Sequence, residues 1–295
     1  MKNITKKRFV IIDGCGLLFR AYYAVPQMLS QDNFPVGAIY GFIQSLKFII
    51  NRLIPRKNSI PTMLAIALDI GGGENFRYKI YGEYKKNRKS IPEDLVSQLK
   101  LIRPMLDAFG ITYISDPTCE ADDIIATYTK YAVQNNYDVT IISSDKDLMQ
   151  LISQDVSFFD INKKKFCSEN DVFEKFLVTP KQICDYLSIV GDRADNIPGV
   201  RGIGKKIASE LLNKFQTLES IYDNLHAITE IKIKSMLENG YESAMLSKKL
   251  VTLNDSVQLH FSMDELQWHG FHAKSSSISD FLSQYSLESL IGVFK

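Results

Sequence analysis

The sequence predicts an α/β protein with a doubly wound, mostly parallel sheet, followed by a smaller helical part. Three short runs, 9–12, 63–68 and 139–142, are apolar at nearly every position, which is typical of strands buried on both faces of a parallel sheet. Segments with helical spacing of apolar residues lie between these runs. From Thr179 onward, helical segments separated by glycines replace the strand-like runs. The alternation therefore predicts the sheet over about residues 8–175.

The elements follow one another in a regular order. After the first strand, apolar residues recur at i, i+3, i+4 and i+7 from Ile39 to Leu53, which predicts a core-facing helix. A second amphipathic segment, 95–109, leads into a short strand at 111–114, and a helix at 121–134 precedes the strand 139–142. In the second part we expect helices at 180–190, 205–215, 218–225 and 244–253.

Composition excludes several classes of protein. The 295 residues are 45% hydrophobic and 23% charged, which is typical of a globular chain and excludes disorder. Thirty-five Lys and Arg against thirty-four Asp and Glu leave a net charge of +1, so net charge alone indicates no nucleic-acid partner. The first apolar run ends at Asp13, too early for a signal peptide or a membrane span. The four cysteines form no C-x-x-C pair, so we expect a cytoplasmic protein without a zinc site.

Carboxylates follow each of the three predicted buried strands. Asp13, Asp69 and Asp145 stand where these strands end, and the carboxyl ends of parallel strands meet at one edge of a sheet. A single Asp in such a place is usually a helix cap, but its recurrence at every strand end favours a shared site. Further acids that we expect at this edge are Glu120, Asp122, Asp123, Asp147, Asp192 and Asp195.

So many carboxylates would repel one another unless cations lay between them. Hard oxygen ligands suit Mg²⁺ or Mn²⁺, and this number of acids exceeds what one ion uses, so we expect two Mg²⁺ ions, with Mn²⁺ as a substitute. Glu120 and Asp122 can reach one centre only if Glu120 lies in an extended segment before the helix, because residues two apart on a helix point apart. Paired ions of this kind catalyse phosphodiester hydrolysis.

A basic segment follows the second strand. Residues 77–89 contain six Lys and Arg against one Glu, interleaved with tyrosines that include Tyr84. Such a run is most often a solvated helix face. Here it follows Asp69 and the glycines 71–73, so it would lie above the acidic edge. Lys and Arg bind phosphates and tyrosines stack on bases, which favours a channel for single-stranded nucleic acid.

A second basic segment is rich in glycine. Residues 199–206 read Gly-Val-Arg-Gly-Ile-Gly-Lys-Lys between two predicted helices. Gly202 and Gly204 permit a tight turn whose amide N–H groups face a phosphate, and Lys205 and Lys206 add charge. An ordinary helix-helix turn is the alternative. We interpret the segment as a helix-hairpin-helix that binds the backbone of duplex DNA without reading its sequence.

Together these motifs resemble the 5′ nuclease family of bacterial DNA polymerase I N-terminal domains and phage flap endonucleases. The matching segments are 10–14 with 18–22, 76–77 with 84–85 and 88, 120–123, 144–148, 191–192 with 195–200, and 245–252. The resemblance implies a PIN-like catalytic domain over 1–175 with a helical arch at about 74–103. It also implies a helix-hairpin-helix subdomain over 176–255 and a C-terminal segment, 256–295, that packs on the nuclease.

The resemblance further implies a monomeric 5′–3′ exonuclease and flap endonuclease that acts on 5′-flap or branched DNA in primer removal and repair, alone or ahead of a polymerase domain. One metal ion would be held by Asp13, Asp69, Glu120 and Asp122, and the other by Asp145, Asp147 and Asp192, with Asp123 and Asp195 in the same cluster. Phosphate contacts would come from Arg20, Arg77, Lys85 and Arg88, with Lys85 stabilising transition-state charge. A potassium ion would lie at the hairpin. Segment 69–77 is one residue longer than the family pattern.

Three alternatives remain at this stage. Gly14-x-Gly16 after the first strand would suit a dinucleotide-binding oxidoreductase, but Phe19 occupies the place of the third glycine. A DNA-binding module without catalysis would not need all the acids. A PIN-type ribonuclease would share the acids, whereas the hairpin and the basic segment favour a DNA junction.

Overall fold

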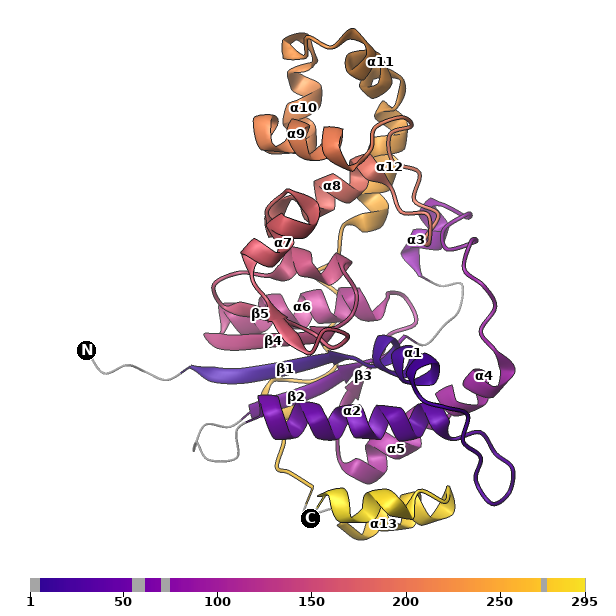
Figure 1. Cartoon of the computed structure of the whole chain (residues 1–295). Helices are drawn as coiled ribbons and strands as arrows, with labels where there is room; N and C mark the ends of the chain where they lie inside the picture. Colours follow the sequence, from indigo (N-terminus) through magenta and orange to yellow (C-terminus); the bar gives the residue numbers. More distant parts are fainter. Residues whose placement is uncertain (1–5, 55–61, 70–74, 272–274, 295) are drawn as a thin grey trace, which may run out of the picture.

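The computed structural model describes residues 6–54, 62–69, 75–271 and 275–294. Its centre is a 6-stranded sheet in the order β3-β2-β1-β4-β5-β6 (Figure 1). All neighbouring strands run parallel except β6, which pairs antiparallel with β5 at one edge. The strands are β1 (Lys7–Asp13), β2 (Thr62–Ala67), β3 (Tyr113–Ile114), β4 (Tyr137–Ser143), β5 (Val156–Asp160) and β6 (Lys165–Cys167).

The strand β1 lies at the point where the order of the sheet reverses. It pairs with β2 on one side and with β4 on the other, so that Ile12 lies beside both Ile66 and Ile142. In sheets of this kind the carboxyl ends of the strands that flank the reversal form the ligand-binding crevice. The predicted doubly wound sheet is confirmed, and the acids that follow β1, β2 and β4 come to this crevice.

Helices cover both faces of the sheet. Side chains alternate along a strand, so Val10 and Ile12 pack toward α1 and α2, while Phe9 and Ile11 pack toward α6. The first face carries α1 (Gly14–Ala24), α2 (Gly37–Leu53), α4 (Glu93–Leu99), α5 (Ile102–Phe109) and α13 (Ser275–Gln284), and the second carries α6 (Ala121–Gln134). The helix α13 follows the helical part in sequence yet packs back on α5, where the rings of Phe281 and Phe109 lie 6.4 Å apart.

A helical part lies on the side of α6 that faces away from the sheet and extends away from the molecule's centre (Figure 1). It consists of α8 (Ile183–Val190), α9 (Lys205–Phe215), α10 (Leu218–Asp223), α11 (Ile231–Asn239) and α12 (Tyr241–Val251), and it is joined to the sheet through α7 (Glu169–Phe176). The helix at 205–215 lies where the sequence predicts it, whereas α11 was missed. None of the helices among the described residues combines the length and hydropathy needed to span a membrane.

Two other differences from the sequence-based expectations have local causes. The single helix expected at 95–109 is wrong, because the segment forms α4 and α5 with a break at Lys100 and Leu101. Pro104 has no N–H to bond to the carbonyl of Lys100, so one continuous helix would leave that carbonyl unpaired. The hairpin of β5 and β6 was also missed. The arch expected at about 74–103 contains only one further short helix, α3 (Phe76–Ile80).

Candidate active site

The acidic edge forms at the carboxyl ends of the central strands. Asp13 ends β1, while Asp69 and Asp145 follow β2 and β4 by two residues. The three carboxylates lie close enough for the charges of Asp69 and Asp145 to raise the pKa of Asp13. The structure therefore brings together the three acids that the strand ends predict.

Asp13 is held in place by its own helix. Its carboxylate accepts hydrogen bonds from the Gly16 N–H and the Ser143 hydroxyl, both at 2.8 Å, and it caps α1. Burial, above all, raises the pKa of Asp13 to about 6. A Cβ at Gly16 would lie 2.2 Å from the carboxylate, so this glycine is needed for close approach to Asp13 rather than for a dinucleotide.

The start of α6 supplies a second group of acids. Glu120 precedes the helix with φ −93° and ψ 162°, the extended conformation required for Glu120 and Asp122 to reach one centre. Burial and the charges of Asp145 and Asp13 raise the pKa of Asp122 well above its usual range. The Ala121 N–H donates to Asp69 at 2.8 Å, which ties this helix to the end of β2.

A third group comes from the segment after β4 and the loop after α8. Burial and the Asp145 charge raise the pKa of Asp147 to about 7, and its buried Oδ1 has no hydrogen-bond partner among the described residues. Asp192 forms an ion pair with Lys146, which the sequence reasoning missed. Although burial opposes it, the Lys146 ammonium lowers the pKa of Asp192 below its usual value.

These carboxylates share one edge but do not form a preformed metal cage. In the part of the chain that the structure describes, no three His, Cys, Asp or Glu side chains are placed to hold one metal ion together. Several of them bond to protein donors instead, as Asp145 does to the Asp147 N–H at 2.9 Å and Asp69 to the Ala121 N–H at 2.8 Å. The donor set nevertheless fits a hard divalent ion, because it is all oxygen and leaves Asp147 Oδ1 unpaired.

Two cations of the basic segment lie at the acidic edge. Lys85 forms an ion pair with Glu120, and Arg88 with Asp195 at 2.7 Å. Burial opposes it, but the Glu120 carboxylate raises the pKa of Lys85 above its usual value. Arg20 lies on α1, with its guanidinium 3.5 Å from the Ser45 hydroxyl. Lys85 and Arg88 therefore occupy the region expected of phosphate-binding side chains.

Arg77 and Asp123 occupy a different place from the one expected. The Arg77 side chain is 2% exposed and Asp123 is 0% exposed, and they form two parallel hydrogen bonds of 2.6 and 2.7 Å. Arg77 also donates to the carbonyls of Leu250 and Thr252. The pair joins α3 and α6 to the end of α12, and the Arg77 guanidinium also lies 3.5 Å from the Glu120 carboxylate. Both side chains are therefore bonded within the protein interior.

Tyr84 also differs from its expected role in stacking on a base. It is 4% exposed, and its hydroxyl donates to Glu120 at 3.1 Å. Its ring packs edge-on against Tyr78 in the core. The Lys85 ammonium lies 5.0 Å from the centre of the Tyr84 ring, and the ring is too deeply buried to stack on a base.

The glycine-rich segment forms the turn between α8 and α9. Gly202 has φ +90°, a conformation that residues with a side chain rarely adopt. Gly204 precedes the first turn of α9, and Lys205 and Lys206 are exposed there. The amides at the start of this helix thus face solvent beside two cations, as the sequence predicts for a phosphate-binding hairpin.

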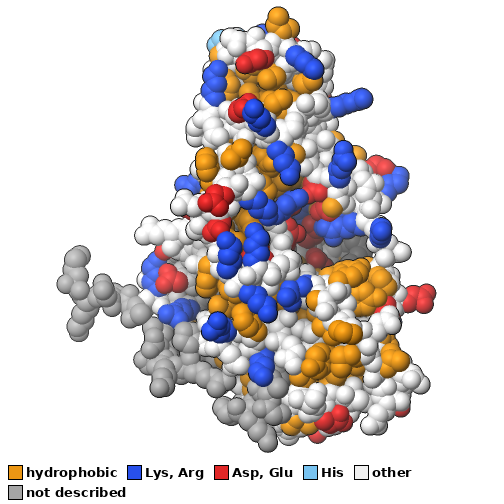
Figure 2. All heavy atoms as spheres, viewed as in Figure 1, with side chains coloured by type: hydrophobic (Ala, Val, Ile, Leu, Met, Phe, Trp, Pro, Cys, Tyr) orange, Lys and Arg blue, Asp and Glu red, His pale blue; other side chains and the backbone are white. Residues whose placement is uncertain are grey.

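Further basic residues lie near the edge and were not singled out from the sequence. Burial and the nearby Lys163 and Lys146 lower the pKa of Lys175, which indicates a cluster of cations between the β5–β6 hairpin and α7. Figure 2 shows acidic side chains at the waist of this face with Lys and Arg on both sides. The run of three lysines at 163–165 is the signal that could have indicated this cluster.

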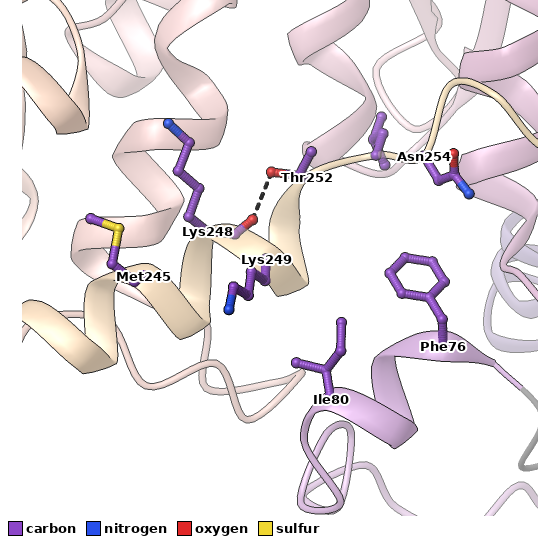
Figure 3. A pocket seen from close by; sticks show the side chains of 8 residues that line it. Phe76, Ile80, Met245, Lys248, Lys249, Thr252 and Asn254 are labelled. Carbon is purple, nitrogen blue, oxygen red and sulfur yellow. Dashed lines mark hydrogen bonds between the residues drawn. The ribbon is translucent and has the colours of Figure 1, made fainter.

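A pocket of about 440 Å³ lies between α3 and the end of α12 (Figure 3). Its walls are largely apolar and include Phe76, Ile80 and Met245, with Lys249 at its side. None of the acids of the edge lines it. The candidate site is therefore the open acidic edge and not this pocket. The expected extra residue in segment 69–77 lies partly outside the described residues.

A doubly wound sheet with a carboxylate cluster at its switch point, cations above the cluster and a glycine-rich helical hairpin beside it defines a nuclease. Comparison with known proteins identifies which one. Residues 8–177 match the family described as 5′-3′ exonuclease, N-terminal resolvase-like domain, and residues 178–274 match the 5′-3′ exonuclease, C-terminal SAM fold. The chain belongs to the 5′–3′ exonuclease family, whose members are metal-dependent hydrolases. This confirms the resemblance seen in the motifs and excludes the oxidoreductase.

Two relatives illustrate the range of the family. A 5′-3′ exonuclease of Buchnera aphidicola subsp. Schizaphis graminum is 33% identical over 272 residues, covering 90% of this chain and 93% of the relative. A DNA polymerase I of Rhizobium leguminosarum is 38% identical over 258 residues, covering 87% of this chain. The chain spans only 25% of that polymerase.

Solved structures show the same fold at lower identity. The T5 D15 protein, co-crystallised with metal ions, superimposes with a TM-score of 0.67 at 21% identity, covering 98% of this chain and 100% of that chain. The catalytic core of Rad2 in complex with DNA gives a TM-score of 0.59 at 16% identity, covering 98% and 93%. The mostly parallel sheet and the helical part are thus shared, which confirms the PIN-like fold class.

Proposed function

We propose that this 5′–3′ exonuclease is structure-specific and hydrolyses DNA phosphodiesters, as exonuclease and flap endonuclease, where single and double strands meet. The observation that carries the proposal is that Lys85 and Arg88 pair with Glu120 and Asp195 at the acidic edge, and that the loop of Asp195 leads directly into the hairpin of Gly202 and Gly204. The hairpin suits a duplex backbone, and the cations suit the phosphate beside the junction. The same division of charge explains a net charge near zero.

We propose that the cofactors are two Mg²⁺ ions, for which Mn²⁺ substitutes. One would be held by Asp13, Asp69, Glu120 and Asp122, and the other by Asp145, Asp147 and Asp192. When bound, such ions supply a water nucleophile at neutral pH and neutralise the leaving oxygen. A potassium ion at the hairpin carbonyls belongs to the same proposal. Burial first, and then the neighbouring Asp145 charge, raise the pKa values of Asp122 and Asp147; a bound cation would offset both effects, which supports the proposal.

The chain's own cations do the remaining work. The Lys85 side chain is 15% exposed. In such a partly buried site a positive charge stabilises a phosphorane-like transition state more than it would in water. Arg88 would orient the phosphate, and Arg20 on α1 would also contact it. Lys205 and Lys206 would hold the duplex. Arg77, Asp123 and Tyr84 are assigned no contact with DNA, because all three are buried.

The proposed organisation is a catalytic domain over 1–175, a hairpin subdomain over 176–255 and a C-terminal segment, 256–295, that packs on the nuclease. We propose that the protein acts as a cytoplasmic monomer on 5′-flap and branched DNA, in primer removal and repair. A polymerase domain in the same chain is the proposed partner by analogy with the DNA polymerase I relatives, of which this chain covers 25–30%.

The first test uses a DNA 5′ flap labelled at its end. We expect cleavage near the junction with Mg²⁺ and none in EDTA. Asp145→Ala and Asp192→Ala should abolish cleavage while retaining flap binding, whereas Asp255→Ala, an exposed acid paired with Lys130, should be unchanged. Full cleavage by both edge variants would contradict the metal assignment, and equal cleavage of an RNA flap would favour the ribonuclease alternative.

The second test separates Lys85 from its neighbour. Lys85→Ala should slow single-turnover cleavage by about 100-fold if the ammonium stabilises developing charge. Lys86→Ala is the matched control, because Lys86 is exposed and forms an ion pair with Glu83 at 2.7 Å, away from the acidic edge. A Lys85→Ala enzyme with the full rate would remove Lys85 from the reaction.

A further inference from the structure

The turn that carries Lys85 is bonded directly to the loop that leads to the hairpin. The backbone N–H of Lys85 donates to the carbonyl of Asp195 at 2.9 Å, and Arg88 donates to the Asp195 carboxylate at 2.8 Å. The two segments are about a hundred residues apart in sequence and lie side by side next to α3 (Figure 1). The cations over the acidic edge are thus attached to the helical part and not only to the sheet.

Two asparagines form the centre of this connection. The Asn196 side-chain amide donates to the carbonyl of Glu83 at 2.7 Å and accepts from the Asn87 side chain at 3.1 Å. Asn87 also donates to the carbonyl of Arg193 at 3.1 Å. We call Asn87 and Asn196 the asparagine clamp. The clamp contacts the chain on both sides of Lys85: at Glu83, two residues before it, and at Asn87, two residues after it.

Lys85 needs such support because of its backbone. Its φ is +58°, in the left-handed region that is unfavourable for a residue with a Cβ atom. Surrounding structure must therefore hold this conformation in place. The left-handed turn directs the Lys85 ammonium to Glu120 at the acidic edge.

The loop side of the clamp is itself rigid. Asp192 and Ile197 exchange two backbone hydrogen bonds, of 2.9 and 2.7 Å, which close the loop. The N–H of Gly199 then donates to the Ser247 hydroxyl on α12 at 2.9 Å. Asn196 adopts φ +55° within this closed loop, so its side chain leaves the loop in a fixed direction.

We propose that Asn196 and Asn87 are positioning residues that hold Lys85 in its left-handed conformation over the acidic edge. The inference rests on the role proposed above for Lys85. The loop before the hairpin thereby sets the position of Lys85. The duplex-binding hairpin and the Lys85 side chain at the scissile phosphate are then connected through this loop. Neither asparagine touches the reacting atoms.

The test removes the side chain of the clamp and keeps its backbone. Asn196→Gly retains access to positive φ but loses both side-chain hydrogen bonds. Asn136→Gly is the matched control, because Asn136 also has a positive φ, +63°, and lies exposed between α6 and β4. We expect Asn196→Gly to lower the single-turnover rate by about 10- to 100-fold, since small misplacements of a catalytic group have effects of this order. Its affinity for flap DNA in EDTA and its melting temperature should match those of the control.

A double-mutant cycle shows whether the clamp acts through Lys85. In the Lys85→Ala background, Asn196→Gly should cause no further loss of rate, because the side chain that it positions is already gone. Losses that multiply would overturn the proposal, as would an Asn196→Gly enzyme with the full rate. If Lys85→Ala is slow while Asn196→Gly is not, the positioning role of the asparagine clamp is wrong but the role of Lys85 stands. If Lys85→Ala keeps the full rate, the role proposed for Lys85 is wrong, and the positioning role of the clamp is wrong with it.

Discussion

Replacing Asp123 by Asn would remove the carboxylate that forms the two-bond ion pair with Arg77 in the core and would leave Glu120, at 3.5 Å, as its remaining charged neighbour. Arg77 is 2% exposed, and its guanidinium donates to both Asp123 oxygens and to the carbonyls of Leu250 and Thr252. Breaking a buried pair by removing one partner costs about 3–5 kcal/mol, because the other charge stays buried after losing its hydrogen-bonded partner. We expect the free energy of unfolding to fall by this amount.

The Asn side chain cannot replace the carboxylate at this position. The two Asp123 oxygens also accept from the backbone N–H groups of Asn254 at 2.8 Å and Glu120 at 3.0 Å. An amide has one oxygen, and its NH₂ group would face donors on the other side. The loss should therefore lie toward the upper end of the range.

Urea unfolding followed by circular dichroism measures this change. Asp122→Asn is the matched control, since it also neutralises one carboxylate at the start of α6. Burial and the like charges around it raise the pKa of Asp122, so its neutralisation should leave stability equal or higher. If Asp123→Asn is as stable as wild type but fails to cleave DNA, Asp123 serves the reaction directly and the structural assignment is refuted.

Two further predictions concern the hairpin and the acidic edge. Gly202→Ala should lower the free energy of unfolding by about 1–2 kcal/mol and weaken duplex binding, because φ is +90° and the new Cβ would lie 2.9 Å from Met236. Gly82→Ala is the control, because Gly82 lies outside the hairpin with open space at its Cβ, and it should change neither quantity in urea titrations and binding assays. Equal behaviour of the two variants would contradict this account. Burial raises the pKa of Asp13 to about 6 and of Asp147 to about 7, from an ordinary 3.8. Between pH 3.8 and these raised values, the folded state therefore binds more protons than the unfolded chain does. Stability in EDTA should therefore fall as pH rises from 3.8 to about 7, and an increase over this range in pH-dependent melting would show that these pKa values are not raised.

Much of the fold and part of the site could be predicted from the sequence because their signals are local. Continuous apolar runs mark strands buried on both faces, and the helix at 121–134 lies where its periodicity places it. Asp13, Asp69 and Asp145 were expected together because parallel strands end at one edge. The hairpin followed from the spacing of Gly199, Gly202 and Gly204.

The direction in which a charged side chain points could not be predicted in the same way. Arg77 and Lys85 belong to one basic segment, yet Arg77 is buried and Lys85 reaches the acidic edge. What separates them is the set of partners: Arg77 bonds to Leu250, 173 positions away in sequence. A buried charge is stable only where such distant groups compensate it, so its role depends on packing that no local pattern records.

The sequence by itself determined the class of fold, the acidic edge and the chemistry that oxygen ligands allow, because these depend on residue type and strand position. Tertiary structure alone decided that Asp123 and Tyr84 belong to the core and that Lys146 lies against Asp192. It also decided that Asn196 reaches the turn of Lys85. The physical reason is that desolvation and hydrogen bonding act over a few ångströms in space, whereas the groups involved are tens to hundreds of residues apart in the chain.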